Sequence, residues 1–463
     1  MDETRELLEE TAAMAADFLA SLDERPVFPT VDADSLRAAL GGPLPKEPSD
    51  PREVIAELRA GAEPGVVAIP SGRYFGFVIG GSVPAALAAD WLTSTWDQNA
   101  GLYAAGPSAA VVEEIAGDWL RGLLGIPAHA SFAFVTGCQM ANFTALGAAR
   151  QHVLAESGWD VNGDGLVGAP RVRVIVGAKV HITVIRALRL LGLGAPVVIP
   201  ADAQGRIVIE ELRQALAGGD GPTIVCAQAG EVNTGSFDPL PEIAGAARTA
   251  GAWLHVDGAF GLWAAASPSL AHLVAGAEHA DSWATDAHKW LNVPYDSGIA
   301  FCAHPDAHRS AIGAQAEYLI QADEATVRDE VDWTPEFSRR ARGFAVYAAL
   351  RSLGRRGIAE LVGRTCAHAR RFSEELAQLP GFELLNDVVL NQVLFRFDSD
   401  ERTDDVLRRV QESGEAWLSG TTWDARRAIR ISVSNWRTSD ADVERTVAAF
   451  EAAVYAGGQV PAR

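Results

Sequence analysis

The sequence predicts an α/β protein whose large domain has a mainly parallel sheet covered by helices on both faces. Over residues 83–345, short runs rich in Val, Ile and Leu alternate with longer helical patterns. These runs are almost continuously apolar, as expected for strands of a parallel sheet, because both faces of such strands are buried. After residue 346 the pattern changes to a long helical stretch, short strands and a final helix. This change predicts a smaller α+β domain over 346–463.

Residues 1–82 are predicted to form a separate helical segment. The opening "MDETRELLEETAAMAADFLASL" has apolar residues at helical spacing among acidic ones, and Pro/Gly punctuation follows in "GGPLPKEPSDPREV". The apolar stripe of the first helix has little of its own domain to pack on. We therefore expect this segment to pack against a partner subunit and to serve in dimerisation.

The strand–helix units of the large domain can be placed in order. The strand "SFAFVTG" precedes the helix "QMANFTALGAARQHVLA", "RVRVIVG" leads through "AKVHIT" to "VIRALRLLGLG", and "TIVCAQAG" precedes "LPEIAGAARTAG" and the strand "AWLHVDG". In the last part, "NQVLFRF" and "RAIRISVS" read as strands, and Ser439 can cap the final helix. Ligands of such sheets bind beyond the carboxyl ends of the strands, so polar residues at strand exits are candidate site residues.

Composition excludes several classes of partner. The 463 residues include 39 basic and 60 acidic ones, a formal net charge of −21, which argues against binding to nucleic acid or to an anionic membrane. The opening lacks the basic start and apolar core of a signal peptide, and no apolar run reaches the roughly 20 residues of a membrane span. The four cysteines lie far apart without a CxxC pair. A reduced, cytoplasmic location is therefore expected.

The stretch "DVNGDG" resembles the start of a calcium-binding loop. Asp160, Asn162 and Asp164 stand at ligand positions, but the bidentate acid of that loop falls on Arg171. We therefore expect a polar surface segment and no metal site.

Two residues at strand exits have the chemistry of a cofactor site. Lys289 in "DSWATDAHKWLNV" can form an imine with an aldehyde if its amine is freed, although a surface lysine is the ordinary explanation of such a residue. Asp257 ends the strand "AWLHVDG" and can pair with the ring N–H of a flat ligand, although a turn aspartate is the alternative.

Two further features follow the same pattern. His181 lies between a strand and a helix, where an imidazole can stack on an aromatic cofactor. Thr136, Gly137 and Cys138 form a strand-to-helix turn of the type that binds phosphate. Each feature alone is weak, but a phosphate turn, a stacking group, a ring-nitrogen carboxylate and an imine lysine in this order predict pyridoxal 5′-phosphate (PLP).

The stretches "HVDGAFG" and "DSWATDAHKWLNVPYDSG" resemble the PLP-dependent group II decarboxylases, which include aromatic-L-amino-acid, glutamate and 2,4-diaminobutyrate decarboxylases. The similarity extends over most of the chain, from "RYFGFVIGGSVPAALAADWL" to "RISVSNWRTSDADVER". The resemblance implies fold type I and a homodimer with active sites at the subunit interface.

The resemblance also implies roles for single residues. Lys289 would hold PLP as an internal aldimine, and Asp257 would pair with the pyridinium nitrogen. His181 would stack on one face of the ring and Ala259 would lie against the other, while His288 would sit beside the aldimine. The phosphate would be held by Thr136, Gly137 and Cys138. The implied reaction is decarboxylation of an L-amino acid to the amine and CO₂ through a quinonoid intermediate.

The sequence departs from the family pattern in places that affect the reaction. Asp286 stands where family members often have an Asn that donates to the phosphate, and "GEVNTG" with Glu231 replaces the common "GTT". A loop tyrosine credited with protonating the α-carbon is missing; Glu330 lies about at its position, and Tyr318 is a possible substitute. These departures leave open an aldehyde-forming oxidase, an aminotransferase or a non-catalytic dimeric relative.

The substrate is expected to be aromatic, with acidic and diamino substrates as alternatives. Tyr295, Phe77 and Tyr103 can line an aromatic pocket, whereas Asn99, expected to reach the pocket of the partner, suits a more polar substrate. Arg430 on a C-terminal strand is a candidate partner for a substrate carboxylate.

Overall fold

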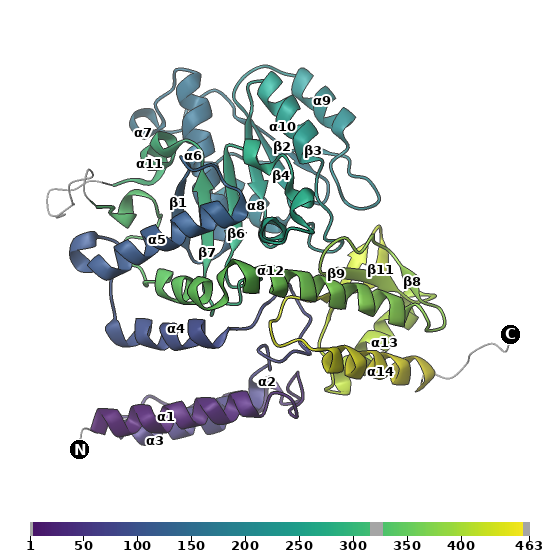
Figure 1. The fold of residues 1–463 in the computed structure, drawn as a ribbon. Coiled ribbons are helices and arrows are strands. Elements are labelled where there is room, and N and C mark those ends of the chain that lie inside the picture. The colour runs from purple at the N-terminus through teal and green to yellow at the C-terminus, as the bar shows by residue number, and fades with distance from the viewer. Residues whose placement is uncertain (1–2, 315–326, 457–463) are drawn as a thin grey trace.

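The computed structural model describes residues 3–314 and 327–456, which form a sheet-containing large domain, a smaller C-terminal domain and an N-terminal arm (Figure 1). The seven strands of the large sheet lie in the order β1-β7-β6-β5-β4-β2-β3. Within the described ranges, only β7 runs antiparallel to its neighbours in this sheet. The predicted mainly parallel sheet is therefore confirmed. The strands are β1 (Ser131–Val135), β2 (Arg173–Gly177), β3 (Val197–Ile199), β4 (Thr223–Gln228), β5 (Trp253–Asp257), β6 (Ser282–Asp286) and β7 (Gly298–Cys302).

Helices cover both faces of this sheet. One face packs against α6, which in turn contacts α8 and α11, and the other packs against α5 and α10. The helices of the large domain are α4 (Pro84–Trp96), α5 (Pro107–Leu124), α6 (Cys138–Glu156), α7 (Val161–Asp164), α8 (Ile182–Leu190), α9 (Ile209–Ala217), α10 (Leu240–Thr249) and α11 (Pro305–Ile312).

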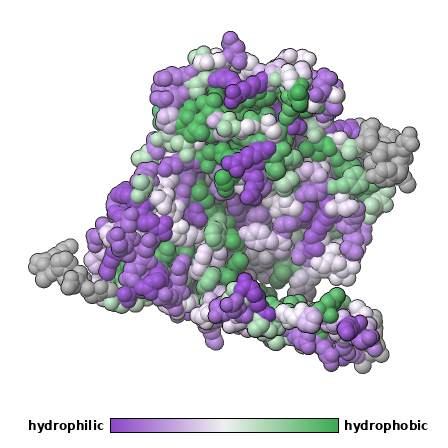
Figure 2. Space-filling view, turned by 180° about the vertical axis from the view of Figure 1, so that it is seen from behind, coloured by the Kyte–Doolittle hydropathy of each residue, from purple (hydrophilic) through white to green (hydrophobic). Residues whose placement is uncertain are grey.

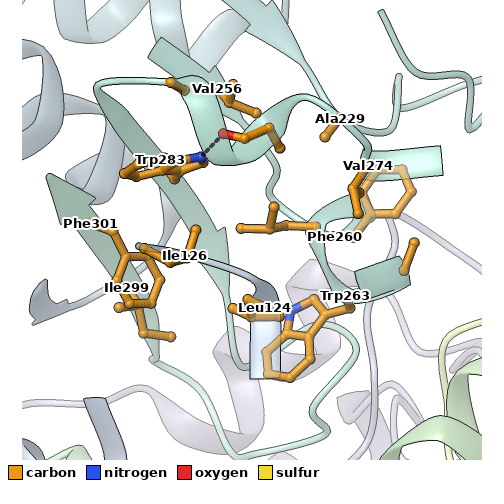
Figure 3. Close-up of a cluster of buried hydrophobic side chains, with 14 of the residues drawn as sticks. Leu124, Ile126, Ala229, Val256, Phe260, Trp263, Val274, Trp283, Ile299 and Phe301 are labelled. Carbon is orange, nitrogen blue, oxygen red and sulfur yellow. Dashed lines mark hydrogen bonds between the residues drawn. The ribbon is translucent and has the colours of Figure 1, made fainter. Parts of the chain in front are cut away.

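The apolar strands are buried on both sides, as their composition predicts. Along β4, Ile224 and Cys226 face one hydrophobic cluster while Val225 and Ala227 face another. Figure 3 shows part of the second cluster, where Trp283 packs among side chains of neighbouring strands. The indole N–H of Trp283 donates to the carbonyl of Ala277 at 2.8 Å, so this large side chain is buried without an unpaired donor.

The C-terminal domain has its own core and its own sheet. Its four strands lie in the order β10-β11-β9-β8 and are antiparallel. Ser439 caps α14, as predicted, because its hydroxyl accepts from the amide of Asp442 at 3.3 Å while the Asp442 carboxylate accepts from the amide of Ser439 at 2.9 Å. The elements are α12 (Gly343–Leu376), β8 (Glu383–Leu384), β9 (Gln392–Arg396), α13 (Asp400–Glu412), β10 (Ser419–Trp423), β11 (Arg426–Ser432) and α14 (Asp440–Ala456).

The helix α12 joins the two domains and crosses the expected boundary at 345/346. Its first part packs on α4 and α5, and its later part packs on β9 and α14. Gly354 interrupts the helix with φ 60° and ψ 176°, a conformation that favours glycine, so the helix bends between its two contacts. The expected domain limits stay a prediction.

The N-terminal arm consists of α1 (Glu3–Ala20), α2 (Ala33–Leu40) and α3 (Pro51–Ala62), and α1 and α3 lie side by side beyond the body of the protein (Figure 1). In these three helices, all of which the structure describes, Gly61 is the only fully buried residue. The arm exposes apolar side chains such as Leu8 and Leu58 among charged ones, and Figure 2 shows this mixed surface along the lower edge. No helix in the described ranges is long and apolar enough to cross a membrane. The four cysteines, all described, are buried free thiols.

Candidate active site

The sequence-predicted residues meet at the carboxyl edge of the large sheet. Asp257 is the last residue of β5, and Lys289 follows the end of β6 by three residues. Cys138 opens α6 directly after the turn that leaves β1, and its thiol lies 3.4 Å from the carboxylate of Asp257. His181 precedes α8, and its ring nitrogen accepts from the amide of Thr183 at 3.3 Å. Four separate segments of the chain thus contribute to one site.

Lys289 is a buried amine paired with a carboxylate. Its Nζ lies 3.1 Å from Oδ2 of Asp286, and its side chain is 17% exposed. Burial by itself lowers the pKa of an amine, but the negative charges of Asp286 and Asp257 outweigh burial here, so the pKa of Lys289 is raised. Without a ligand, therefore, this lysine is held in its charged form.

Asp257 accepts hydrogen bonds from three directions. Oδ1 accepts from the amide of Ala259 at 3.1 Å and from the thiol of Cys138, and Oδ2 accepts from the side-chain amide of Asn142 at 3.1 Å. These donors hold the carboxylate at a fixed orientation. Ala259 leads away from the strand, and its carbonyl accepts from the amide of Asp286 at 2.9 Å, which ties the exits of β5 and β6 together.

A chain of buried hydrogen bonds links Asp257 to His181 and was not found from the sequence. His255 Nε2 lies 2.8 Å from Oδ1 of Asn142, and the amide nitrogen of Asn142 lies 3.1 Å from both Asp257 and the hydroxyl of Thr183. Because an amide oxygen only accepts, His255 must donate through Nε2, which leaves the Asn142 amide to donate to Asp257 and to Thr183. The Thr183 hydroxyl then donates to Nδ1 of His181 at 2.8 Å.

This direction of donation sets the protonation of both imidazoles. Burial lowers the pKa of His255 to about 4 and also lowers that of His181. His181 is therefore neutral, accepts at Nδ1 and carries its hydrogen on Nε2. One sequence signal for Asn142 was a polar residue one helical turn after Cys138 in an otherwise buried stretch.

His288 stands on the other side of the lysine. Its Nδ1 accepts from the amide of Ser297 at 3.1 Å, so its hydrogen lies on Nε2, which is 3.4 Å from Oδ1 of Asp286. Burial lowers the pKa of His288. The ring stacks on Tyr295 with centroids 4.3 Å apart. Tyr295 itself is 53% exposed, so the stack lies at the open side of the site.

The turn from 136 to 138 has room only for small residues. A Cβ on Gly137 would come within 3.1 Å of Cε1 of His288 and 3.5 Å of Oδ1 of Asp286. Gly298 at the start of β7 lies directly behind, because a Cβ there would overlap the backbone of Gly137. Thr136 lies between β1 and Gly137, as expected, but the amide of Cys138 donates to Oδ1 of Asp286 at 2.6 Å.

The residues present fit a PLP group at this edge. Two buried polar atoms, Oγ of Ser297 and Nε of Arg430, have no hydrogen-bond partner among the described residues. The imidazole of His181, the carboxylate of Asp257 and the amine of Lys289 lie close enough to interact electrostatically. Unpartnered buried donors of this kind are expected where a polar ligand completes the site.

The segment 76–81 packs directly on the lysine loop. A Cβ on Gly80 would overlap the carbonyl oxygen of Lys289. Asn292, with φ 55°, holds the junction: its Oδ1 accepts from the amides of Gly81 at 2.7 Å and Trp436 at 2.9 Å, and its amide donates to the carbonyls of Trp290 and Ser434. One side chain therefore joins the N-terminal segment, the lysine loop and the C-terminal domain.

Arg430 lies on β11 and reaches the large domain. Its guanidinium donates to the carbonyl of Val232 at 2.9 Å, and burial lowers its pKa to about 10, while Glu231 raises it. Arg430 also lowers the pKa of His181, so its charge lies near the ring-stacking position. Glu231 is buried and accepts from the amides of Asn233 and Thr234, each at 2.7 Å, so its carboxylate stabilises a turn.

Other expected residues lie elsewhere in the subunit. Tyr103 donates its backbone amide to Asp329 at 2.7 Å, and the side-chain oxygen of Asn99 accepts from the amides of Gly101 and Arg339. Glu330 is buried and pairs with Arg328 at 2.9 Å. Tyr318 lies outside the described residues.

The calcium-like stretch forms a short helix. Asp160 caps α7, because its carboxylate accepts from the amide of Asn162 at 3.0 Å. The expected polar surface segment is confirmed, since Asn162 and Asp164 are exposed.

Comparisons with known proteins agree with this geometry. The family model "Pyridoxal-dependent decarboxylase conserved domain" matches residues 34–398. The aromatic-L-amino-acid decarboxylase of Bacillus atrophaeus is 28% identical over 95% of this chain and 92% of that protein. The 4-hydroxyphenylacetaldehyde synthase of Rhodiola rosea is 26% identical over 92% of this chain and 90% of that protein. Among solved structures, Oryza sativa TDC with PLP and tryptamine has a TM-score of 0.92 at 24% identity and covers 99% of this chain and 98% of that one, a likeness that shows the fold.

Proposed function

Because the chain belongs to the family of pyridoxal-dependent decarboxylases and is a PLP-dependent amino-acid decarboxylase of fold type I, we propose that its substrate is an L-amino acid with an aromatic side chain. We also propose that Lys289 is the residue that holds the cofactor covalently. The convergence of the Lys289 amine, the Asp257 carboxylate and the neutral His181 at one edge of the sheet supports this assignment.

Bound PLP supplies an aldehyde that reacts with amines and a ring that accepts the electron pair released when CO₂ leaves. Asp257, held by three donors, would pair with the ring nitrogen of the cofactor. His181 and Ala259 would lie against the two faces of its ring. His288 carries its hydrogen on Nε2, which lies 3.4 Å from Oδ1 of Asp286, the carboxylate that also pairs with Lys289.

Aromatic side chains around the mouth of the site support an aromatic substrate. Tyr74 stacks on Trp417 with centroids 5.2 Å apart, and Phe77 packs on the same indole at 5.3 Å. Tyr74 lies near enough to Tyr295 to interact with it electrostatically, and Tyr295 stacks on His288. This row of rings ends at His288, which precedes Lys289 in the chain. The aromatic specificity in the name of the Bacillus atrophaeus relative points the same way.

Arg430 is the proposed partner of a substrate carboxylate. Its buried Nε has no partner among the described residues, and a guanidinium binds carboxylates in a bidentate manner. By binding that carboxylate, Arg430 would fix the orientation of the substrate in the site.

A homodimer is proposed on the basis of surfaces that the single chain leaves uncovered. The arm buries almost none of its residues, and α4 exposes Trp91, Leu92 and Trp96. Apolar side chains that are exposed together on a surface are usually covered in an oligomer. Light scattering after gel filtration is expected to give twice 49.1 kDa, and a mass of one chain would contradict the proposal.

The central experiment measures CO₂ and amine together for a panel of aromatic, acidic and basic L-amino acids. Stoichiometric CO₂ and amine from an aromatic substrate are expected. The substrate proposal fails if only acidic or basic amino acids react. In Lys289→Ala, borohydride reduction is expected to leave no protein-bound cofactor; a reducible protein adduct that persists in this variant would overturn the assignment of Lys289.

An aldehyde-forming reaction is the second candidate, favoured by Glu330. This residue stands about where decarboxylases of the family have a loop tyrosine, and its carboxylate is paired with Arg328. The Rhodiola rosea relative is named for an aldehyde product. In that reaction the amino acid, O₂ and water give aldehyde, CO₂, ammonia and hydrogen peroxide. Peroxide in stoichiometric amount would support this candidate, and its absence beside a full yield of amine would exclude it.

A further inference from the structure

The carboxylate of Asp286 occupies the amino end of α6. Its Oδ1 accepts from the amide of Cys138 at 2.6 Å, and its Oδ2 lies 3.1 Å from the amine of Lys289. Nε2 of His288 lies 3.4 Å from the same carboxylate, and Asp286 is 2% exposed. Three donors from the turn after β1 and the loop after β6 thus surround one anionic side chain.

These surroundings are those of an anion site. The first amides of a 19-residue helix point outward with the positive end of the helix dipole, and a lysine adds a full positive charge. Gly137 leaves the space open, since a Cβ there would approach both Asp286 and His288. In this chain, the carboxylate of Asp286 already accepts the hydrogen bond of the first of these amides, that of Cys138.

The identity of the side chain matters for a phosphate. A carboxylate has no hydrogen to donate and carries a negative charge, so it repels a phosphate, whereas the isosteric amide of asparagine can donate to one. A phosphate that approaches the Cys138 amide must displace Asp286 or lie beside it. Either event costs binding free energy that an uncharged residue would not cost.

We propose that Asp286 is an internal competitor for the phosphate group of the cofactor, so that this chain selects phosphorylated ligands weakly and holds the cofactor mainly through its ring and its covalent bond. This inference rests on the proposed function of Lys289 and Asp257 at the same site. It makes Asp286 a specificity-determining residue for the cofactor, and it predicts a cofactor that exchanges readily with the solution.

The test uses ligands that cannot bond to the lysine. Because Asp286 also contacts Lys289, its replacement changes the reactivity of the amine, so PLP alone would mix two effects. Pyridoxine 5′-phosphate and pyridoxine have no aldehyde, and their dissociation constants are measured by fluorescence on the full-length apoprotein. The ratio of the two constants reports what the phosphate contributes.

In the wild type, pyridoxine 5′-phosphate is expected to bind less than about tenfold more tightly than pyridoxine; a ratio of about a hundredfold or more overturns the proposal. In Asp286→Asn, the phosphorylated ligand is expected to bind about tenfold more tightly than to the wild type, while pyridoxine changes by less than about threefold. An unchanged ratio in this variant also overturns it. The wild-type measurement decides the question even if the variant does not fold.

Asp281→Asn is the matched control. Asp281 precedes β6 at its other end, and its carboxylate accepts from the amide of Leu254 at 2.7 Å and pairs with His304 at 2.9 Å. The same carboxylate-to-amide change there is expected to leave the ratio unchanged. If PLP and both pyridoxine ligands fail to bind the wild type and every variant, the proposed function fails; if they bind with a high wild-type ratio, only the inference about Asp286 fails.

Discussion

Removal of the Asn142 side chain is expected to weaken two parts of the site at once. Asn142 donates to Asp257 and to Thr183 and accepts from His255, and it is fully buried. In Asn142→Ala, the carboxylate loses one charge-assisted hydrogen bond, worth about 1.5–3 kcal/mol. The N–H of His255 is left buried without a partner, which costs about 1–3 kcal/mol more.

These costs convert to a measurable shift in melting temperature. Together they lower the free energy of unfolding by about 3 to 6 kcal/mol. The unfolding entropy is about 2.1 cal/mol/K per residue, so a chain of 463 residues that unfolds as one unit changes by about 1 kcal/mol per degree. Differential scanning calorimetry of the apoprotein is therefore expected to show a Tm about 3–6 °C below that of the wild type.

Thr183→Val separates the two branches of the network. It removes the hydroxyl that links Asn142 to Nδ1 of His181, but it leaves the bond from Asn142 to Asp257 in place. The expected fall in Tm is about 1–2 °C, and affinity for a ring ligand should fall less than in Asn142→Ala. An Asn142→Ala protein that melts within one degree of the wild type, or that behaves like Thr183→Val in both measurements, would refute the assigned network.

Three further changes test other parts of the structure. In Gly80→Ala the new methyl overlaps the carbonyl of Lys289. Urea denaturation is expected to show a free energy of unfolding about 1–3 kcal/mol lower, and borohydride reduction is expected to trap little cofactor on the protein. Trapping at the wild-type level would contradict the packing of Gly80 on the lysine loop. Burial, aided by the charge of Arg328, lowers the pKa of His308 to about 3. Between about pH 6.5 and pH 3, therefore, the unfolded chain binds a proton at this histidine and the folded chain does not. The free energy of unfolding consequently falls as the pH falls, by up to about 1.4 kcal/mol per pH unit. The difference in Tm between the wild type and His308→Gln should therefore be smaller at pH 4 than at pH 7. A difference that stays constant would contradict the lowered pKa of His308. Arg430→Gln is expected to raise the KM for the amino acid about tenfold or more with unchanged cofactor absorbance; an unchanged KM would remove Arg430 as the carboxylate partner.

The fold was predictable because local patterns determine it. Each apolar run that was read as a strand is a strand of the large sheet or of the C-terminal sheet. The strand exits of the large sheet hold Asp257, the Cys138 turn and the segments of His181 and Lys289. The turn residues Gly137 and Gly298 illustrate why: a Cβ on Gly298 would overlap the backbone of Gly137, and a Cβ on Gly137 would crowd the ring of His288. Such steric needs are visible in a sequence as small residues at fixed places.

The partners of the site residues could not be predicted in this way. Asp286 and Cys138 are in contact although β1 and β6 are not neighbours in the sheet. The antiparallel strand β7 lies between these two strands. No spacing in the sequence indicates this insertion. Asn142 was equally hidden, since a single polar residue in a buried helix face has many possible partners. The departure at Asp286 was visible as a residue type, but its contact with the amino end of α6 was not.

The four hydrogen bonds of Asn292 determine when the site can exist during synthesis of the protein. Two of them require Ser434 and Trp436, which follow Asn292 in the chain by 142 and 144 residues. The strands around the lysine loop are therefore made well before all four of these hydrogen bonds can form. A nascent chain that still lacks Ser434 and Trp436 cannot complete the junction at Asn292.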